Sequence, residues 1–541
     1  FDCRRRSDRC ANRSGVAVMN RQHCYLCVDI GTQSIRTALV DQNLQIIAVH
    51  SDPQQIMTDP VNNQIEVNIE HVWESVAAGS RDILQKSNLS PSTIAGVCVG
   101  AIMHVPVPID ENGTLLLRQV QIYSDKRCKD YVRAFQSTPE ALRAYKMTGS
   151  IATASWLGFK LRWIKEHQPD IYKKSWKFLT ASAYINFRLT GNICIDYSEA
   201  SGSYLMDQTC QWNSWLATQV GVDIEKLPEI RNSWEVLGGI TEAAASATGL
   251  TPGTPVVVGG GDMGCAALAV GSLSPGDCVV TTGTSSGADL FCQHPVWNPS
   301  VINLRHVVDG WLAFGSVECC GGSMTWLRKH FFHDEPSDCA YQKINQMASS
   351  VPAGSDGVLF LPQLLGEREN LGSPDAKGAF IGLSFDTDLA HLCRSLMEGV
   401  CYAERRILDA FTQSGMHFNA LYSRGGGVNS RIWNQIRCDI YQHPIHVLED
   451  ADNSGLIGAA LLAGKGVGLI QNMEQVAKEN IHVRETYYPN TSSQATYAEM
   501  QKAYMAAHNA LLPTFEFLKH ANIVTRNEDA FFSTSSTFEN N

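Results

Sequence analysis

The chain has 541 residues, enough for more than one domain with a buried core. Hydrophobic residues make up 44% and charged residues 18%, which excludes a disordered chain and a coiled coil. The net charge of −11 argues against binding to nucleic acid or to an anionic membrane surface, and no apolar run approaches the ~20 residues of a membrane span.

The 17 cysteines are scattered, and many lie in apolar runs such as Cys24-Tyr-Leu-Cys27. A secreted disulfide scaffold would be short and dense in cysteine, so this pattern predicts a reduced, cytoplasmic protein that uses Cys as a small core residue. The spacing of Cys24 and Cys27 also suits zinc. No second pair or histidine cluster follows it, so core packing is the favoured interpretation.

The first strands are predicted after a basic N-terminal segment. Residues 1–22 lack the apolar stretch of a secretory signal, and we expect them to be a disordered extension, with an Arg-rich targeting peptide as the alternative. A three-stranded meander over 25–30, 35–40 and 45–49 follows, with polar turns between the strands. Helical spacing of apolar residues over 69–85 and a short apolar run over 94–99 predict a helix and a buried strand.

The second half of the chain repeats part of this pattern. A strand runs into a glycine loop over 254–261, and another strand over 277–282 ends in a second Gly-Thr-x-Ser turn, at 283–286. Such a repeat is what a duplicated nucleotide-binding domain leaves behind. Further on, the sequence predicts a helix over 389–411, a strand over 421–423, a helix from near Asn429 and a small-residue helix over 454–464 that packs closely. These elements predict one domain over 23–262, a second over 263–520 and a frayed tail over 521–541.

The first polar turn follows a carboxylate that ends a buried strand. Backbone N–H groups in the turn at Gly31 can hold phosphate oxygens, and the hydroxyls of Thr32 and Ser34 add donors. Asp29 offers the carboxylate oxygen that Mg²⁺ prefers. A hairpin with a polar turn explains the motif equally well.

Two further glycine-containing loops could serve the same ligand. The turn beginning at Gly283 provides a second set of phosphate donors, and the glycines of Gly425-Gly426-Gly427 let the backbone approach a flat base closely. The helix from Asn429 would cap that site. Three glycines alone are a weak signal, and the chain contains no GxxxxGK[ST] loop.

The sharpest single candidate is Asp262, which follows the glycine turn 259–261. A carboxylate placed there after a buried strand is expected to face a cleft, because an unpaired buried charge is costly. It could take a proton from a substrate hydroxyl that attacks phosphorus. The alternative is a turn Asp that caps the next helix.

Taken together, these motifs resemble those of the FGGY carbohydrate kinases, over nearly the whole chain from about Cys24 to about Leu518. The resemblance implies two ribonuclease-H-like α/β domains of the actin and hexokinase type, with ATP and a sugar in the cleft between them. It implies Asp262 as catalytic base, Asp29 as holder of Mg²⁺, and a set of ATP-binding residues. These are Gly31, Thr32, Ser34, Arg36, Thr282, Gly283, Thr284, Gly425, Gly426, Gly427 and Asn429. The segment 378–398 is also close to the long C-terminal signature of the family.

Within the family, the residues around the sugar site are similar to those of xylulokinases. The resemblance places Met103, His104, Asp125 and Arg127 beside the sugar, and Met263 just after the base. Met263 stands where similar xylulokinases carry Asn, and a thioether cannot donate the amide hydrogen bond. Core packing remains the alternative for Met103, and a structural role for His104.

Two functions of different class follow from these residues. The first is an ATP-dependent kinase of a terminal ketose hydroxyl, a pentulose or another sugar or polyol. The second is an actin- or chaperone-like ATPase module that drives partner contacts. The proposed sugar residues favour the kinase, whose partners would be ATP and a small sugar. The sequence leaves the oligomeric state open, and a homodimer is compatible with it.

Overall fold

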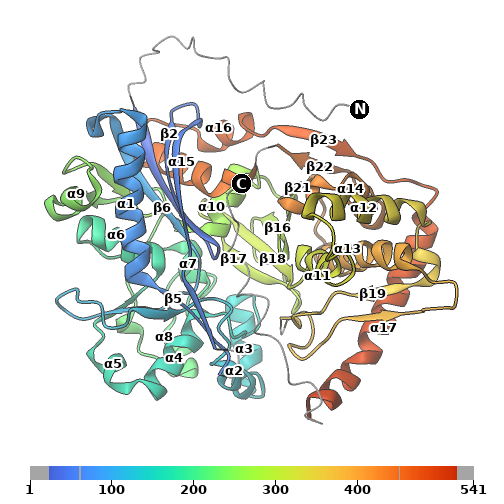
Figure 1. Ribbon diagram of the computed structural model, residues 1–541. Coiled ribbons are helices and arrows are strands. Elements are labelled where there is room, and N and C mark those ends of the chain that lie inside the picture. Colours follow the sequence, from blue (N-terminus) through green and yellow to red (C-terminus); the bar gives the residue numbers. More distant parts are fainter. Residues whose placement is uncertain (1–22, 60–61, 369, 450, 521–541) are drawn as a thin grey trace, which may run out of the picture.

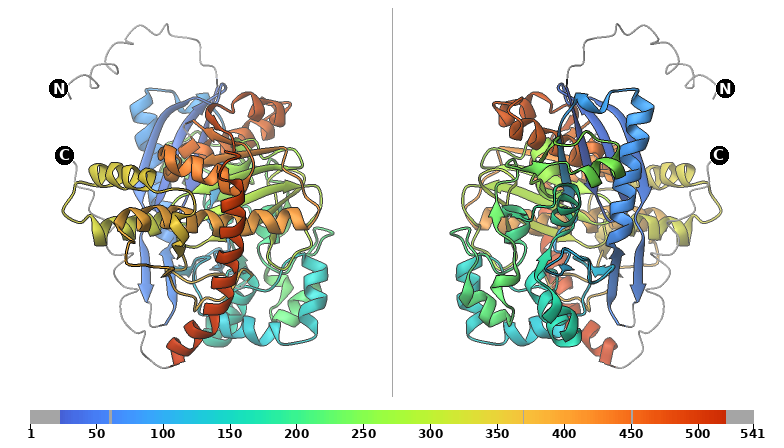
Figure 2. Two further views of the ribbon diagram at one scale, coloured as in Figure 1. Left: turned by 90° about the vertical axis from the view of Figure 1, so that its right-hand side faces the viewer. Right: turned by 90° about the vertical axis from the view of Figure 1, so that its left-hand side faces the viewer.

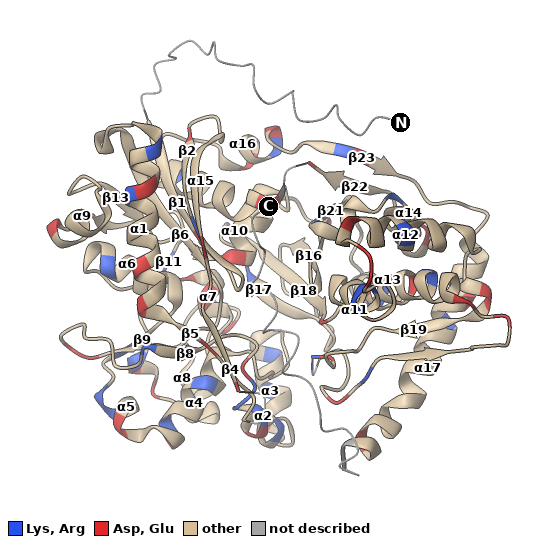
Figure 3. Cartoon of the chain, viewed as in Figure 1, with Lys and Arg blue, Asp and Glu red and all other residues tan. Residues whose placement is uncertain are grey.

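The structure is a computed structural model that describes residues 23–59, 62–368, 370–449 and 451–520. It contains two mixed sheets, each flanked by helices, which form the left and right lobes of Figure 1. Figure 3 shows acidic and basic residues mixed over both lobes. Among the described residues, no helix is both long and apolar enough to cross a bilayer. The predictions for residues 1–22 and 521–541 lie outside the described residues.

The first sheet begins with the predicted meander. Strands β1 and β2 pair antiparallel, as do β2 and β3, while β6 runs parallel to β1 on its other side. The strand order is β12-β13-β6-β1-β2-β3, and β14 also pairs with β6. The bounds are β1 Cys24–Ile30, β2 Ser34–Asp41, β3 Ile46–Pro53, β6 Ile94–Ala101, β12 Val236–Gly239, β13 Pro255–Val257 and β14 Gly260–Gly261.

Helices cover both faces of the first sheet. Helices α1 (Ile69–Ser87), α6 (Ala181–Thr190) and α9 (Glu242–Thr248) form a core with one face. Helices α10 (Asp262–Ala269) and α15 (Ser454–Gly466) pack against the other face. The two helices approach so closely that a Cβ on Gly458 would lie 1.9 Å from the Cys265 carbonyl oxygen. This confirms the close packing predicted for the small-residue helix.

Helix α15 therefore lies on the first sheet although it comes late in the chain. The predicted division at residues 262 and 263 places this helix in the second domain. By its place in the sequence α15 belongs to the predicted second domain, but it packs on the sheet of the first. The exact domain boundary stays a prediction.

The second sheet repeats the central arrangement of the first. Strand β15 pairs antiparallel with β16 and parallel with β21, as β1 does with β2 and β6. The strand order is β17-β18-β16-β15-β21-β22-β23. The bounds are β15 Asp277–Thr282, β16 Ser286–Cys292, β17 Ile302–Arg305, β18 Trp311–Val317, β21 Ala420–Arg424, β22 Ile445–Leu448 and β23 Val483–Tyr487.

The helices of the second lobe bury a large apolar core against this sheet. Their bounds are α11 Gly321–Phe331, α12 Ser337–Ser350, α13 Leu389–Gln413, α14 Arg431–Tyr441 and α17 Gln494–His520. Helix α16 (Met473–Glu479) packs instead with α10 and α15, in the core on the first sheet. The left view of Figure 2 shows α17 along the outer side of this lobe. The helix expected from near Asn429 starts at Arg431, after a short 3-10 turn over Gly426–Asn429.

Smaller elements extend the first lobe below its sheet (Figure 1). A helical subdomain with its own apolar core contains α2 Lys129–Gln136, α3 Glu140–Thr148, α4 Leu157–His167, α5 Pro169–Lys174 and α8 Ser214–Val220. The other short elements of this lobe are β4 Ile56–Asp59, β5 Gln64–Asn68, β7 Val107–Ile109, β8 Gln119–Gln121, β9 Lys177–Leu179, β10 Ile195–Asp196, α7 Tyr197–Ser201 and β11 Ile230–Arg231. In the second lobe, β19 Leu359–Leu361 pairs with β20 Ala379–Ile381 and packs on α13.

Candidate active site

A cavity of about 580 Å³ lies between the two lobes. Its lining comes from the β1–β2 turn and α10 on one side, and from β15, β16, β18 and β21 on the other. Of the predicted site residues, it is lined by Asp29, Gly31, Thr32, Ser34, Arg36, Met103, His104, Asp262, Met263 and Gly283. The structure thus brings together most of the residues selected from motifs that lie far apart in the sequence.

The first turn predicted to bind phosphate is closed by a hydrogen bond from the N–H of Gly31 to the Ser34 carbonyl, 2.9 Å long. Asp29 stands at the end of β1 with 7% of its surface exposed, and the Arg36 guanidinium pairs with its carboxylate. Arg36 also donates to the carbonyl oxygen of Asp452, at 2.8 Å. Arg36 thus lines the cavity, held between the first strand and the segment before α15, and its role in ATP binding stays a prediction.

The second phosphate turn and the triple glycine pack against each other. Gly425 has φ +91°, and a Cβ there would lie 2.6 Å from the Thr282 carbonyl oxygen. A Cβ on Gly427 would lie 2.7 Å from Thr282 Oγ1. Gly425 and Gly427 are thus required because the backbone passes close to another group. In this structure that group is Thr282, whereas the sequence predicts a flat base. Within the described chain, the cavity lining includes none of Thr282, Thr284, Gly425, Gly426, Gly427 or Asn429.

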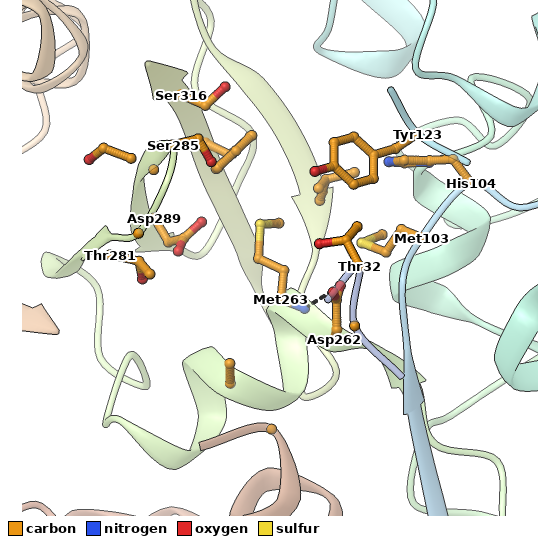
Figure 4. Close-up of a pocket in the computed structure, with 18 of the residues that line it drawn as sticks. Thr32, Met103, His104, Tyr123, Asp262, Met263, Thr281, Ser285, Asp289 and Ser316 are labelled. Carbon is orange, nitrogen blue, oxygen red and sulfur yellow. Dashed lines mark hydrogen bonds between the residues drawn. The ribbon is translucent and has the colours of Figure 1, made fainter. Parts of the chain in front are cut away.

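Asp262 is the first residue of α10 and is partly buried at the cavity wall. Burial, together with the nearby carboxylate of Asp29, raises the pKa of Asp262 from 3.8 to about 7, although Arg424 acts in the opposite direction. Its Oδ1 accepts a hydrogen bond from the N–H of Met263, at 2.8 Å (Figure 4). A carboxylate with a pKa near neutral pH is well matched to general base catalysis.

The glycine turn before Asp262 is fixed by its surroundings. Gly259 has φ +70°, and a Cβ there would lie 2.1 Å from the Val99 carbonyl oxygen. The N–H of Gly261 donates to Ser198 Oγ at 3.0 Å, and Ser198 in turn donates its own N–H to Asp196 at 2.7 Å. Asp196 is 2% exposed, and burial raises its pKa to about 6. This network holds the turn that presents Asp262 to the cavity.

Another part of the cavity lining, here called the His104 wall, is formed by Met103, His104 and Tyr123. His104 has φ +66°, and its Nδ1 lies 2.6 Å from the Gly202 carbonyl, which can only accept, so Nδ1 carries the proton. Burial lowers the pKa of His104 to about 3, which leaves the ring neutral with Nε2 as an acceptor. Met103 packs on the turn before Asp262, because a Cβ on Gly261 would lie 2.7 Å from its Sδ. Figure 4 shows His104 beside Tyr123 and Met103 beside Asp262.

Asp125 and Arg127, predicted beside the sugar, are not among the described residues that line this cavity. Asp125 is 0% exposed and pairs with Arg127 at 2.8 Å, and Arg127 pairs with Glu66 at 2.6 Å. The Arg127 guanidinium also stacks on Trp163. In this structure the pair fixes the backbone next to Tyr123, the residue of the same motif that does face the cavity.

Four charged residues of the cavity lining were absent from the sequence prediction: Asp289, Arg368, Arg424 and Asp452. Arg368 lies over the rings of Tyr123 and Phe314 and pairs with Glu318 at 2.7 Å. Asp289 of β16 and Arg424 of β21 come from the two strands that flank β15 in the second sheet. Arg424 directly precedes the triple glycine, so its place at a strand end was the available signal. Asp289 and Arg368 carry no comparable signal.

The oxygen donors that line the cavity decide whether it suits Mg²⁺. A magnesium ion that arrives with ATP needs one or two carboxylates besides phosphate oxygens and water. Asp29 supplies one carboxylate at the cavity wall, and Thr32 and Ser34 supply neighbouring hydroxyls. Within the described ranges no cluster of three or more His, Cys, Asp or Glu suits a metal. The donor set fits an ion held mainly by its nucleotide.

Comparison with known proteins agrees with this geometry. The model of the N-terminal domain of the FGGY family of carbohydrate kinases matches residues 24–269, and that of the C-terminal domain matches residues 278–467. The xylulose kinase of Bacillus subtilis is 27% identical over 490 residues, which cover 88% of this chain and 95% of that protein. The autoinducer-2 kinase of Klebsiella pneumoniae is 28% identical over 507 residues, which cover 89% and 93%.

The architecture is likewise shared with a solved structure. The crystal structure of xylulose kinase from Rhodospirillum rubrum matches with a TM-score of 0.84 and 27% sequence identity. The match covers 91% of this chain and 100% of that one. The two-domain fold expected from the sequence is therefore confirmed.

Proposed function

Since the chain belongs to the FGGY family of carbohydrate kinases, we propose that it transfers the γ-phosphoryl group of ATP to a terminal hydroxyl of a pentulose. The coarser activity, phosphoryl transfer to an alcohol group of a carbohydrate, follows from the family. The observation that carries the finer proposal is the placement of Asp262, with its raised pKa, in one cavity with the phosphate turn and the His104 wall.

In the proposed reaction, Asp262 accepts the proton of the substrate hydroxyl as its oxygen attacks the γ-phosphorus. The bond between the γ-phosphorus and the bridging oxygen of ADP breaks, and ADP leaves with the electron pair. Little covalent chemistry is asked of the protein, so most of the acceleration comes from positioning and charge stabilisation. Asp29 would hold Mg²⁺, which supplies neutralisation of phosphate charge when bound.

The sugar would lie between Asp262 and the wall formed by Met103, His104 and Tyr123. The neutral His104 offers Nε2 as an acceptor for a sugar hydroxyl, and Ser155 and Thr153 add polar groups to the same cavity. Closure of the two lobes would exclude water, which otherwise competes as the phosphoryl acceptor. The domain boundary near 262, the cytoplasmic location and the homodimer remain predictions beside this proposal.

The proposal is tested by ADP release from Mg-ATP across a panel of D-xylulose, L-xylulose, ribuloses and tetritols. We expect turnover that depends on the sugar, with a pentulose among the best substrates by kcat/KM. ADP release that is independent of any sugar would contradict the kinase and favour the actin-like ATPase module. Turnover restricted to a substrate outside the pentuloses would contradict the finer proposal only.

A second substrate is favoured by the two methionines that flank Asp262. Met103 and Met263 both line the cavity, and Met263 points into it beside Asp262 (Figure 4). An apolar wall gives no hydrogen bond to a hydroxyl and discriminates only ~10–200-fold. We therefore propose as the alternative a substrate with a less polar face, such as a deoxy-ketose, a shorter polyol or the substrate of autoinducer-2 kinases.

The variant Met263→Asn separates the two substrates. It restores an amide donor beside the base, so the ratio of kcat/KM for D-xylulose to that for the best other substrate should rise. Thermal unfolding of the same variant shows whether the Met263 side chain only packs against the neighbouring apolar cores, in which case stability falls and the ratio is unchanged. A wild-type protein already fastest on D-xylulose would contradict the alternative.

A further inference from the structure

Arg424 is a positively charged residue of the second lobe that lines the cavity. It is the last residue of β21, beside Thr281 of β15 in a parallel pair. Ligands of open α/β sheets bind at the carboxyl ends of the parallel strands. The next residue begins the triple glycine that packs on Thr282, so the position of Arg424 is fixed by its backbone.

The side chain of Arg424 is oriented by groups from two segments. Its Nε donates to Thr281 Oγ1 at 2.9 Å, and its Nη1 donates to Ser454 Oγ at the start of α15. Its own carbonyl accepts a hydrogen bond from Thr282 Oγ1, also at 2.9 Å. A guanidinium held in this way spends little conformational entropy when it meets a planar or tetrahedral oxyanion.

Carboxylates of the described residues act on this guanidinium from both lobes. Asp29 and Asp262 belong to the first lobe, Asp289 to the second sheet, and Asp452 to the segment before α15. Arg424 therefore lies within electrostatic reach of both the magnesium candidate and the base candidate. A phosphoryl group passing from the first phosphate turn to a hydroxyl beside Asp262 would pass close to this positive charge.

We propose that Arg424 contacts the γ-phosphoryl group of the bound nucleotide and stabilises the charge of its transition state. The inference rests on the proposed kinase function, and it adds a catalytic residue to Asp262. Arginine suits this task because its fork of N–H groups matches phosphate oxygens and stays charged at any working pH.

Asp289 is the positioning residue in this proposal. It is 5% exposed, its Oδ1 has no hydrogen-bond partner within the described structure, and it lines the cavity (Figure 4). The charge of Arg424 lowers the pKa of Asp289, while burial raises it to about 7. In this proposal Asp289 acts on the phosphoryl group only through the guanidinium of Arg424.

The test compares nucleotides with and without a γ-phosphoryl group. Calorimetry on the full chain measures Kd for MgADP and for the non-hydrolysable MgAMP-PNP, in the wild type and in Arg424→Gln. We expect MgAMP-PNP to bind about 10- to 100-fold more weakly to the variant, the loss of one charge-assisted hydrogen bond, and MgADP to bind almost unchanged. In turnover, kcat should fall at least as much, because the charge grows in the transition state.

Arg368→Gln is the matched control, since Arg368 lines the same cavity on the side of Tyr123 and Phe314. It should leave the ratio of the two nucleotide affinities at the wild-type value. If Arg424→Gln also leaves that ratio unchanged, or weakens both nucleotides equally, the role of Arg424 is refuted. A wild type that binds no nucleotide would instead refute the proposed function.

Arg424→Lys keeps the experiment decisive if the Gln variant unfolds, because it retains the charge but not the fork. We expect an intermediate loss of MgAMP-PNP affinity. The role of Asp289 is tested with Asp289→Asn in a double-variant cycle. The effects on the affinity ratio should be strongly non-additive if Asp289 acts through Arg424, whereas additive effects would refute the positioning role.

Discussion

The substitution Asp262→Asn tests the assignment of the base by two readouts that should move in opposite directions. It removes the proton acceptor, so kcat should fall by ~10²–10⁴-fold while MgADP still binds. The substitution also removes a buried negative charge that lowers the stability of the folded protein. Burial and the Asp29 carboxylate raise the pKa of Asp262 from 3.8 to about 7, so the folded protein holds a proton that the unfolded chain releases.

The size and the pH dependence of the second effect follow from linkage. One pKa unit corresponds to about 1.4 kcal/mol, so a shift from 3.8 to about 7 sets an upper limit of ~4 kcal/mol for the penalty. Water in the open cavity screens the carboxylate, and we expect about 1–2 kcal/mol. Because the shift raises the pKa of an acid, the penalty is complete above pH 7 and disappears as the pH falls towards 3.8.

Thermal unfolding at several pH values, with a coupled assay of ADP release, measures both readouts. We expect the variant to be more stable than the wild type by roughly 2–4 °C in Tm at pH 8, with a smaller difference at pH 5. In the wild type, kcat/KM should fall as the pH decreases below about 7, since the base becomes protonated. A variant with near-normal kcat would refute the assignment, and equal stability at all pH values would refute the electrostatic argument.

Three further predictions concern residues around the base. Asp29→Ala should raise the Mg²⁺ concentration needed for half-maximal turnover and leave sugar binding in the absence of nucleotide unchanged; a normal Mg²⁺ titration would contradict its role. Gly202→Ala would place a Cβ 2.3 Å from His104 Cε1, so KM for the sugar should rise while Kd for MgADP stays constant, as measured by kinetics and calorimetry. Glu199 is buried, and burial raises its pKa, so Glu199→Gln should keep the Tm at pH 7. Glu199→Ala should lower the free energy of unfolding by ~1–3 kcal/mol, because it leaves the His104 N–H without its acceptor.

The elements that the sequence predicts well are those with a strong local cause. The apolar run over 25–30 identifies β1 and the alternation over 35–40 identifies β2, and the polar turn at Gly31 lies between them. The glycine run before Asp262 signals a backbone that no other residue could follow, and Gly259 indeed has a positive φ against β6. In such places, one short segment contains the whole physical reason for its structure.

The elements that the sequence does not predict depend on partners from elsewhere in the chain. The motif containing Asp125 and Arg127 suggests a place beside the sugar, but only the fold shows that both residues are paired with each other and with Glu66 and do not line the cavity. Helix α15 packs on the first sheet for a similar reason, since its small residues meet α10 across the molecule.

Arg424 and Asp289 show why charges of a cleft are hardest to predict. Each lies on a strand whose pattern indicates only burial, and a buried charge in isolation would be too costly to accept. The cost is offset only because β16 and β21 flank the same strand, β15, and because Asp29 and Asp262 arrive from the other lobe. The same convergence that stabilises these charges places them where a phosphoryl group would carry its own. A kinase cleft can thus hold several charged side chains that stabilise one another before ATP binds. Whether each charge stabilises the protein or destabilises it then depends on whether the nucleotide is bound.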